Sequence, residues 1–354
     1  MVFNMNRPQY LLTAAFLLTL ALFQGCARSG SESASIDPAA LKAYAPLPDV
    51  APGKEPITEE KVALGRMLYY ETRLSANQKL SCNSCHDLTK YGVDNQATSV
   101  GDKGQHGDRN SPTVYNAAGH FVQFWDGRAA DVEEQAKGPV LNPVEMAMTS
   151  GKQVVAVLKS MPEYVVAFQK AFPNDKDPVT YDNTGKAIGA FERKLITPAR
   201  WDKFLKGEQT ALTSEEKAGF HTFVASGCQT CHAGALLGGN MYQKIGLVKA
   251  WPDTSDTGRY KVTKSESDKF LFKVPSLRNI DKTGPYFHDG KIPTLDGAVA
   301  KMADHQVGKT LNAAEIQSIV TWMKSLTGEI PVDYIKRPEL PKSTSKTPKP
   351  TEAD

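Results

Sequence analysis

Two short motifs in this sequence each place two cysteines directly before a histidine. They run from Cys82 to His86 (CNSCH) and from Cys228 to His232 (CQTCH). The CxxCH pattern is the attachment signature of c-type haem, in which two thioethers hold the porphyrin and the adjacent histidine is placed to bind the iron. Cysteines this close in sequence bridge badly, and the two pairs lie too far apart for a structural zinc site. We therefore predict two covalently bound haem c groups, held by Cys82, Cys85 and His86 and by Cys228, Cys231 and His232.

The chemistry of each haem depends on the sixth position of its iron. A methionine there raises the reduction potential and closes the iron to substrate, whereas an open position permits peroxide or oxygen chemistry. For the second haem, Met302 lies between Pro293 and the final predicted helix. Met241 and His305 are rival ligands, and Met302 as a core side chain is the remaining interpretation. The spacing alone leaves these alternatives open.

The first residues indicate export. Arg7 precedes an uncharged run from Tyr10 to Phe23, which suits the core of a signal peptide and is too short to span a bilayer. The run ends at Gly25-Cys26, which resembles a lipoprotein cleavage box. Lipidation of Cys26 would anchor an otherwise soluble protein to the periplasmic side of a bacterial membrane. A plain secretory signal, giving a soluble periplasmic protein, is the alternative.

Composition and charge exclude some classes of function. Hydrophobic residues make up 40% of the chain and charged residues 23%, so a packed core is expected. The formal net charge is only +3, and the lysines are spread along the chain instead of forming one basic stripe. We therefore expect no nucleic-acid binding.

Each CxxCH motif follows a predicted helix. Thr58 opens the first helix, with two glutamates in its first turn, and Thr213 opens the second with a capping box. Further helices are expected from Ser150, from Ser160, over 184–196 and from Asn312 to Gly328. Strand signals are sparse, so the predicted fold is mainly α, with two cytochrome-c-like haem domains and long loops. The predicted organisation is a signal peptide with a lipobox at 1–26, a tether at 27–56, haem domains at 57–200 and 201–330, and a disordered tail at 331–354.

Six further stretches carry a resemblance to a known family. They are Gly107 to Thr113 (GDRNSPT), Gln123 to Arg128 (QFWDGR), Gln135 to Pro139 (QAKGP), Val144 to Met146 (VEM), Val274 to Asn279 (VPSLRN) and Gly284 to Gly290 (GPYFHDG). With the two CxxCH motifs, they make the chain from about Thr58 to Gly328 resemble the bacterial dihaem cytochrome c peroxidase family.

The resemblance implies a role for each haem. The N-terminal haem would be the low-potential peroxidatic group and the C-terminal haem a high-potential reservoir, with Met302 as its distal ligand. Trp125 matches the tryptophan between the two haems, where it would carry electronic coupling. Glu145 and Gln135 match the residues of the distal pocket over the first haem. A carboxylate suits that place, because cleaving the O–O bond requires a proton to move from one peroxide oxygen to the other.

The resemblance also implies calcium, and it breaks down at one loop. The side chain of Asn110 and the carbonyls of Thr283 and Pro285 match an interdomain calcium site, and oxygen ligands suit Ca²⁺. In the family a histidine after the first CxxCH caps the resting peroxidatic iron. Here Asp102 stands at that position and His106 is four residues later. Either His106 reaches the iron by another loop path, or the iron is open at rest, which we favour.

The predicted function is therefore reduction of hydrogen peroxide to water, with electrons from a small periplasmic cytochrome c or cupredoxin. The chain would be a cytochrome-c peroxidase and, by the resemblance, a homodimer. The alternative is a dihaem electron carrier without peroxide turnover, which has no use for a polar distal pocket. A relative of the enzyme that matures the tryptophan-derived quinone of methylamine dehydrogenase ranks lower, since that enzyme has a tyrosine where this chain has Met302.

Overall fold

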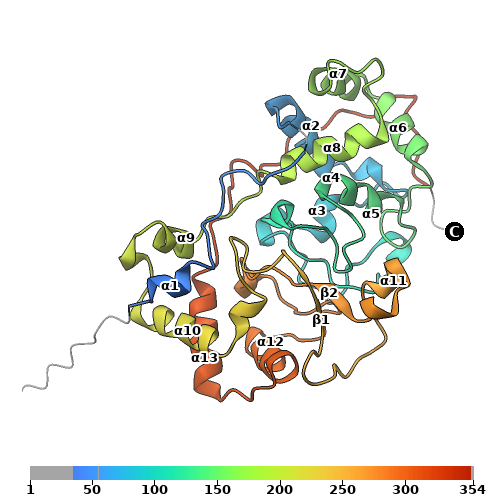
Figure 1. The fold of residues 1–354 in the computed structure, drawn as a ribbon. Coiled ribbons are helices and arrows are strands. Elements are labelled where there is room, and N and C mark those ends of the chain that lie inside the picture. Colours follow the sequence, from blue (N-terminus) through green and yellow to red (C-terminus); the bar gives the residue numbers. More distant parts are fainter. Residues whose placement is uncertain (1–34, 55, 352–354) are drawn as a thin grey trace, which may run out of the picture. The chain divides into compact units, whose positions relative to one another are not determined.

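The computed structural model describes residues 35–54 and 56–351 (Figure 1). The predicted signal peptide and Cys26 lie outside these residues. The described chain is mainly helical with long loops, and this confirms the predicted fold class. Among the described residues no helix is both long enough and apolar enough to cross a membrane. The helices are α1 (Pro38–Leu41), α2 (Glu59–Tyr69), α3 (Cys82–Cys85), α4 (Val132–Gln135), α5 (Lys137–Leu141), α6 (Gly151–Lys159), α7 (Pro162–Ala171), α8 (Tyr181–Glu192), α9 (Arg200–Leu205), α10 (Ser214–Ala225), α11 (Tyr260–Thr263), α12 (Leu295–Met302) and α13 (Ala313–Lys324).

Helices α2, α4, α6, α7 and α8 surround one hydrophobic core, which we call the N-terminal lobe. Thr58 caps α2, as predicted, because its hydroxyl accepts a hydrogen bond from the backbone of Lys61 at 3.2 Å. Helix α2 lies directly against α8. A Cβ at Gly65 would stand 1.9 Å from the carbonyl oxygen of Ala187, so only glycine permits this close approach.

Helices α9, α10, α12 and α13 form a second core, the C-terminal lobe. Two predicted capping boxes are confirmed at its main helices, one beginning at Thr213 for α10 and one at Asn312 for α13. The core between them is aromatic, with Trp201, Phe220 and Trp322 in mutual ring contact. Figure 1 shows α10 and α13 crossing in this lobe. The predicted domain limits at 200 and 330 stay predictions.

The only paired strands in the described residues are β1 (Tyr242–Lys244) and β2 (Leu271–Lys273). They run antiparallel, with Tyr242 opposite Lys273. This small sheet belongs to the long loops that follow the second CxxCH motif. The pairing holds Lys273, the last residue of β2, in a fixed place, and the segment that follows it lines the site described below.

The two ends of the described chain differ from their predictions. The segment 35–54, which belongs to the tether predicted over 27–56, packs on the C-terminal lobe, where Tyr44 contacts Trp201 at a ring distance of 5.7 Å. The segment 331–351, expected to be disordered, lies along the N-terminal lobe (Figure 1). There Ile335 is buried and its carbonyl accepts a hydrogen bond from the Tyr70 hydroxyl. Each end therefore covers the lobe that is farther from it in sequence.

Two hairpins, 123–129 and 286–292, follow the same course in the two halves. Each is closed by an isolated antiparallel bridge between its first and last residues. The second residue of each, Phe124 and Phe287, has a left-handed backbone, with φ of 66° and 69°. The first hairpin leads toward α4 and the second toward α12. The two halves therefore contain a structural repeat at one constant spacing along the chain.

A second pair of matching residues joins the two halves. Asn116 and Asn279 both have left-handed backbones, with φ of 61° and 59°. Their side-chain amides donate to the same hydroxyl oxygen of Thr197, at 2.8 and 2.9 Å. Thr197 is fully buried. This hydroxyl is a shared acceptor for the repeated segments that lead into the two hairpins.

Candidate active site

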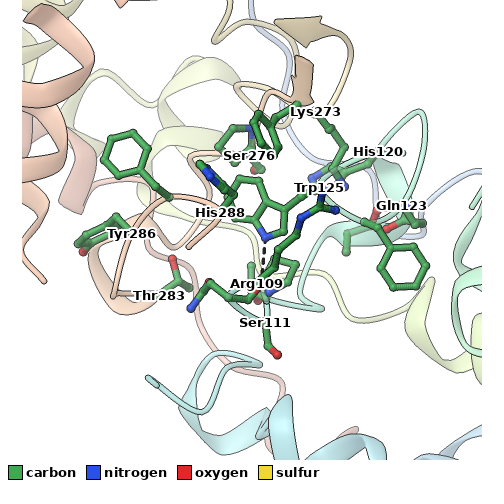
Figure 2. Close-up of a pocket in the computed structure, with 18 of the residues that line it drawn as sticks. Arg109, Ser111, His120, Gln123, Trp125, Lys273, Ser276, Thr283, Tyr286 and His288 are labelled. Carbon is green, nitrogen blue, oxygen red and sulfur yellow. Dashed lines mark hydrogen bonds between the residues drawn. The ribbon is translucent and has the colours of Figure 1, made fainter. Parts of the chain in front are cut away.

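A cavity of about 630 Å³ lies between the two lobes, and both CxxCH motifs open onto it. It is lined by segments that the sequence separates widely, including both repeated hairpins. Figure 2 shows residues from these hairpins around Trp125. The cavity therefore brings together the two predicted haem-attachment sites and the motifs that carry the resemblance.

The second CxxCH motif follows α10 through a tight turn at Gly227, whose φ is 88°. Within it, the Nδ1 atom of His232 lies 3.0 Å from the carbonyl oxygen of Leu237. Burial lowers the pKa of His232, so the imidazole is held neutral. A neutral histidine that donates through Nδ1 keeps Nε2 as a metal ligand, and this is the usual second-shell arrangement at metal sites. His232 therefore fits the predicted role of iron ligand.

Of the three candidate distal ligands for the second haem, Met302 lines the cavity at the end of α12. Met241 is 37% exposed and is absent from the cavity lining. His305 is buried, with Nδ1 3.0 Å from the carbonyl oxygens of Lys249 and Ala250, and it too lies outside the lining. The arrangement favours Met302, which remains a prediction until the ligand is measured.

The first CxxCH motif forms the one-turn helix α3. Ser81 and Ser84 cap it reciprocally, so the turn is fixed by its own side chains. The carbonyl of His86 accepts a hydrogen bond from the buried Tyr69 hydroxyl at 2.7 Å. Burial of the His86 ring lowers its pKa and favours the neutral, metal-binding form. The motif is thus held in a shape that suits an attached haem.

Trp125 lies in the first repeated hairpin and lines the shared cavity. Its indole N–H donates to the carbonyl oxygen of Asn110 at 3.0 Å, the bond drawn as a dashed line in Figure 2. Its ring packs edge-to-face against His288, with centroids 6.5 Å apart. These contacts fix the indole between the loop at Asn110 and the second hairpin, and its role in coupling stays a prediction.

Glu145 and Gln135 line the cavity together with residues of the first CxxCH motif. One carboxylate oxygen of Glu145 accepts a hydrogen bond from the side chain of Asn142 at 2.7 Å. Burial raises the pKa of Glu145, while the hydrogen bond from Asn142 and the charge of Arg128 oppose the rise. The carboxyl group can therefore exchange a proton closer to neutral pH than an ordinary glutamate can.

The loop after the first motif turns its histidine away from the site. His106 is exposed, and its Nδ1 lies 3.2 Å from both the hydroxyl and the carbonyl oxygen of Thr98. It does not line the cavity. Asp102 is buried, and its backbone N–H donates to the carbonyl of Glu145 at 2.7 Å. This loop therefore supports the Glu145 segment, and the arrangement favours a first haem that is open at rest.

The predicted calcium ligands also belong to the lining of the cavity. Asn110, Thr283 and Pro285 all line it. Asn110 is buried, and its amide nitrogen donates to the carbonyl of Gln96 at 2.9 Å, which leaves its oxygen as an acceptor. Amide and carbonyl oxygens suit a hard cation such as Ca²⁺. The described residues contain no cluster of three or more acidic, cysteine or histidine ligands, so the site depends on neutral oxygens.

Comparison with known proteins decides the family. Residues 59–210 match the family described as di-haem cytochrome c peroxidase. Cytochrome c551 peroxidase from Pseudomonas aeruginosa is 48% identical over 305 residues, which cover 84% of this chain and 87% of that protein. The chain belongs to the di-haem cytochrome c peroxidase family. It is a cytochrome-c peroxidase, an oxidoreductase with two haem c groups.

Other family members extend the similarity along most of the chain. Cytochrome c551 peroxidase from Nitrosomonas europaea is 44% identical, covering 88% of this chain and 91% of that one. Methylamine utilization protein MauG from Methylorubrum extorquens is 33% identical, covering 80% and 79%. A solved MauG-like protein associated with microbial copper homeostasis superposes with a TM-score of 0.74 at 27% identity, covering 82% of this chain and 97% of that protein.

Two residues of this site escaped the sequence reasoning. His120 and Lys273 both line the cavity, yet neither belongs to a recognisable metal or catalytic motif. The signal that could have found them is an internal repeat. The FWDGR segment around Trp125 is followed by a similar FHDGK segment around His288, and SPTVYN is followed by VPSLRN at the same distance along the chain. A repeat this regular predicts that the positions between these segments also correspond.

Proposed function

We propose that this peroxidase reduces hydrogen peroxide to water at the first haem, with electrons that enter at the second haem. The supporting observation is the asymmetry of the shared cavity. Glu145 lies near the first CxxCH motif, since the pKa of Cys85 is raised by burial and also by the charge of Glu145, and Gln135 lines the same cavity. Met302 ends α12, whose Val299 packs in one core with Cys228 of the second motif. One half therefore suits peroxide chemistry and the other suits electron storage.

Haem c supplies the redox chemistry, since each bound iron can exchange one electron at a time. The chain would hold these groups through His86 on the first side and through His232 and Met302 on the second. The balanced reaction is H2O2 + 2 e⁻ + 2 H⁺ → 2 H2O. Two haems suit it because a donor that gives one electron per encounter must act twice for each peroxide.

Glu145 would move the proton that O–O cleavage needs. As a carboxylate it accepts a proton from one oxygen of bound peroxide, and as a carboxylic acid it returns that proton to the departing oxygen. The amide of Asn142 holds one of its oxygens at 2.7 Å and so fixes the direction of the group. Gln135 would orient peroxide by hydrogen bonding. Trp125 would couple the two sides electronically.

The partners and setting belong to the same proposal. The electron donor would be a small periplasmic cytochrome c or cupredoxin. Ca²⁺ would bind the oxygens of Asn110, Thr283 and Pro285, and the enzyme would act as a homodimer. It would work on the periplasmic side of a bacterial membrane, held there by a lipid on Cys26. What supports the proposed calcium ligands is that all three residues line the cavity.

The deciding experiment is peroxide-dependent oxidation of a reduced small cytochrome c, with fully oxidised and half-reduced enzyme compared directly. We expect turnover from both forms, because His106 lies outside the cavity and Asp102 replaces the expected histidine. Turnover only after half-reduction would show that a sixth ligand must first leave. No turnover in either form would contradict the proposal and leave a dihaem electron carrier.

A further inference from the structure

A buried lysine stands at the wall of the shared cavity. Lys273, at the end of β2, is only 6% exposed. Its ammonium lies 3.0 Å from Nδ1 of His120 and donates to the carbonyl oxygen of Val122 at 3.1 Å. Figure 2 shows Lys273 and His120 together beside Trp125. Burial lowers the pKa of His120, so the ring is neutral and accepts a hydrogen bond from the ammonium.

Lys273 has no carboxylate partner in the part of the chain that the structure describes. Among the described residues, no acidic group lies within salt-bridge distance of its ammonium. Asp126 acts on it at longer range, and that carboxylate is already paired with Arg109 at 2.6 Å and Arg128 at 3.1 Å. Burial lowers the pKa of Lys273 to about 7, against the weaker opposing effect of Asp126. Without a counter-charge this buried amino group readily loses its proton near neutral pH, and an anion beside it would keep it charged.

The internal repeat shows where Lys273 stands in the architecture. The backbone N–H of Lys273 donates to the carbonyl of Trp125 at 2.8 Å. The backbone N–H of Asn110 donates to the carbonyl of His288, also at 2.8 Å. Trp125 and His288 are matching residues of the two hairpins, and the same spacing relates Asn110 to Lys273. Each half thus binds the hairpin of the other half through the same position.

The correspondence extends to the other proposed calcium ligands. At the same spacing, Thr283 and Pro285 match His120 and Val122. His120 and Val122 are the two residues that hold the ammonium of Lys273. The three residues that would bind Ca²⁺ in one half therefore correspond to three residues of the other half that meet at the amino group of Lys273.

Haem c carries two propionate carboxylates, and both haems must lie in the cavity that Lys273 and His120 line. We propose that the Lys273 ammonium binds a haem propionate and that His120 holds the ammonium in place. In this role the lysine side chain provides the cation in its half of the molecule, as the proposed Ca²⁺ does in the other half. The inference depends on family membership for the haems. It does not depend on peroxide turnover, so the propionate contact and the proposed peroxide turnover can fail independently of each other.

The consequence is a charge effect on one haem. A fixed positive charge beside a propionate offsets its negative charge and favours the reduced iron, which carries less positive charge than the oxidised iron. An ammonium at hydrogen-bonding distance also keeps the propionate ionised. Removing the ammonium should therefore lower the potential of that haem and allow its propionate to take up a proton near neutral pH.

The test is a spectroelectrochemical titration of both haems in the holoenzyme carrying Lys273→Met. At a fixed potential near its midpoint, one haem should show an approximately tenfold lower ratio of reduced to oxidised iron, which for one electron corresponds to about 59 mV. Infrared redox-difference spectra should gain the C=O band of a protonated carboxylic acid. The haem that shifts identifies whose propionate is bound. Lys170→Met, at an exposed lysine on α7, is the matched control and should change neither readout.

A second variant keeps the proposal testable if Lys273→Met fails to retain haem. His120→Asn removes the ring that holds the ammonium and leaves the charge in place. It should lower the potential of the same haem, by less than Lys273→Met does. Unchanged potentials and no new carboxyl band in whichever of these variants retains both haems would overturn the proposal.

Discussion

At the scale of single residues, the proposed chemistry depends on where Glu145 holds its proton. Burial raises the pKa of Glu145, and Asn142 fixes one of its oxygens. A carboxylate with a raised pKa is a better proton acceptor than an ordinary glutamate, and it remains ionised only above that raised value. Activity that needs the carboxylate should therefore be lost on the acid side, as the pH falls through the pKa of Glu145.

Replacing Glu145 by Gln should remove this proton transfer while leaving the shape of the site intact. We expect kcat for peroxide reduction to fall by about 10²-fold or more, the usual contribution of a positioned acid–base group, and the acid limb of the pH profile to disappear. Steady-state kinetics across pH would measure both effects. The control is Glu163→Gln, at an exposed residue on α7. Full activity with an unchanged pH profile in Glu145→Gln would remove the acid–base role.

Met302 has the corresponding importance for the second haem. A methionine ligand raises the reduction potential of haem iron, so Met302→Ala should lower the potential of the second haem and slow turnover sharply. Redox titration with stopped-flow kinetics would measure the two effects together. Met241→Ala is the matched control, because Met241 lies outside the cavity lining. An unchanged potential would assign the ligand role to another residue.

How much could be predicted at this scale varied with the strength of the local signal. The CxxCH motifs and the segments around Trp125 and Glu145 are short and contiguous, so a single pass along the sequence finds them. Lys273 and His120 give no such signal, because a lysine is ordinarily exposed and its burial here depends on contacts between the two halves. Only the internal repeat points to them.

At the scale of elements, helix starts were more predictable than the course of the loops. Capping boxes at Thr213 and Asn312 start helices as expected, because the cap is a contact within one turn. The helix start expected at Ser160 is wrong: α7 begins at Pro162, whose ring suits the first turn of a helix, after an N-cap at Met161. The helix expected over 184–196 is α8, which begins earlier, at Tyr181, and ends at Glu192. The long loops escaped prediction because bonds between the two halves fix them.

The contact between α10 and α13 provides a test of how closely these elements approach. A Cβ at Gly219 would stand 2.0 Å from the carbonyl oxygen of Ser318 and 2.8 Å from Cβ of Trp322. Gly219→Ala should force the helices apart and lower the free energy of unfolding by about 1–3 kcal/mol. Denaturant unfolding of the holoenzyme would measure the loss. Gly107→Ala, where an added Cβ meets nothing within 4 Å, should be nearly neutral. Equal stability of the two variants would contradict the close approach.

At the scale of the whole molecule, the repeated halves and the exchanged chain ends act together. Thr197 accepts hydrogen bonds from Asn116 and Asn279, one from each half. The segment 35–54 packs on the C-terminal lobe and 331–351 on the N-terminal lobe. The composition of these ends suggested a tether and a disordered tail. The two ends are held in place by a few apolar residues that pack in a core. The overall composition of a segment does not reveal such residues, because polar residues outnumber them.

The C-terminal segment should therefore contribute to the stability of the N-terminal lobe. Ile335 is 5% exposed in that core, beside Tyr334, which stacks on Phe191 at a ring distance of 5.1 Å. Ile335→Ala leaves a cavity and should lower the free energy of unfolding by about 2–5 kcal/mol. Val332→Ala removes a side chain that is 69% exposed and should have almost no effect. Thermal unfolding, followed separately at each haem, would show the first haem losing its native absorption spectrum at a lower temperature in Ile335→Ala. If Ile335→Ala unfolds like Val332→Ala, the segment is not part of the folded lobe in solution, and the prediction of a disordered tail would stand.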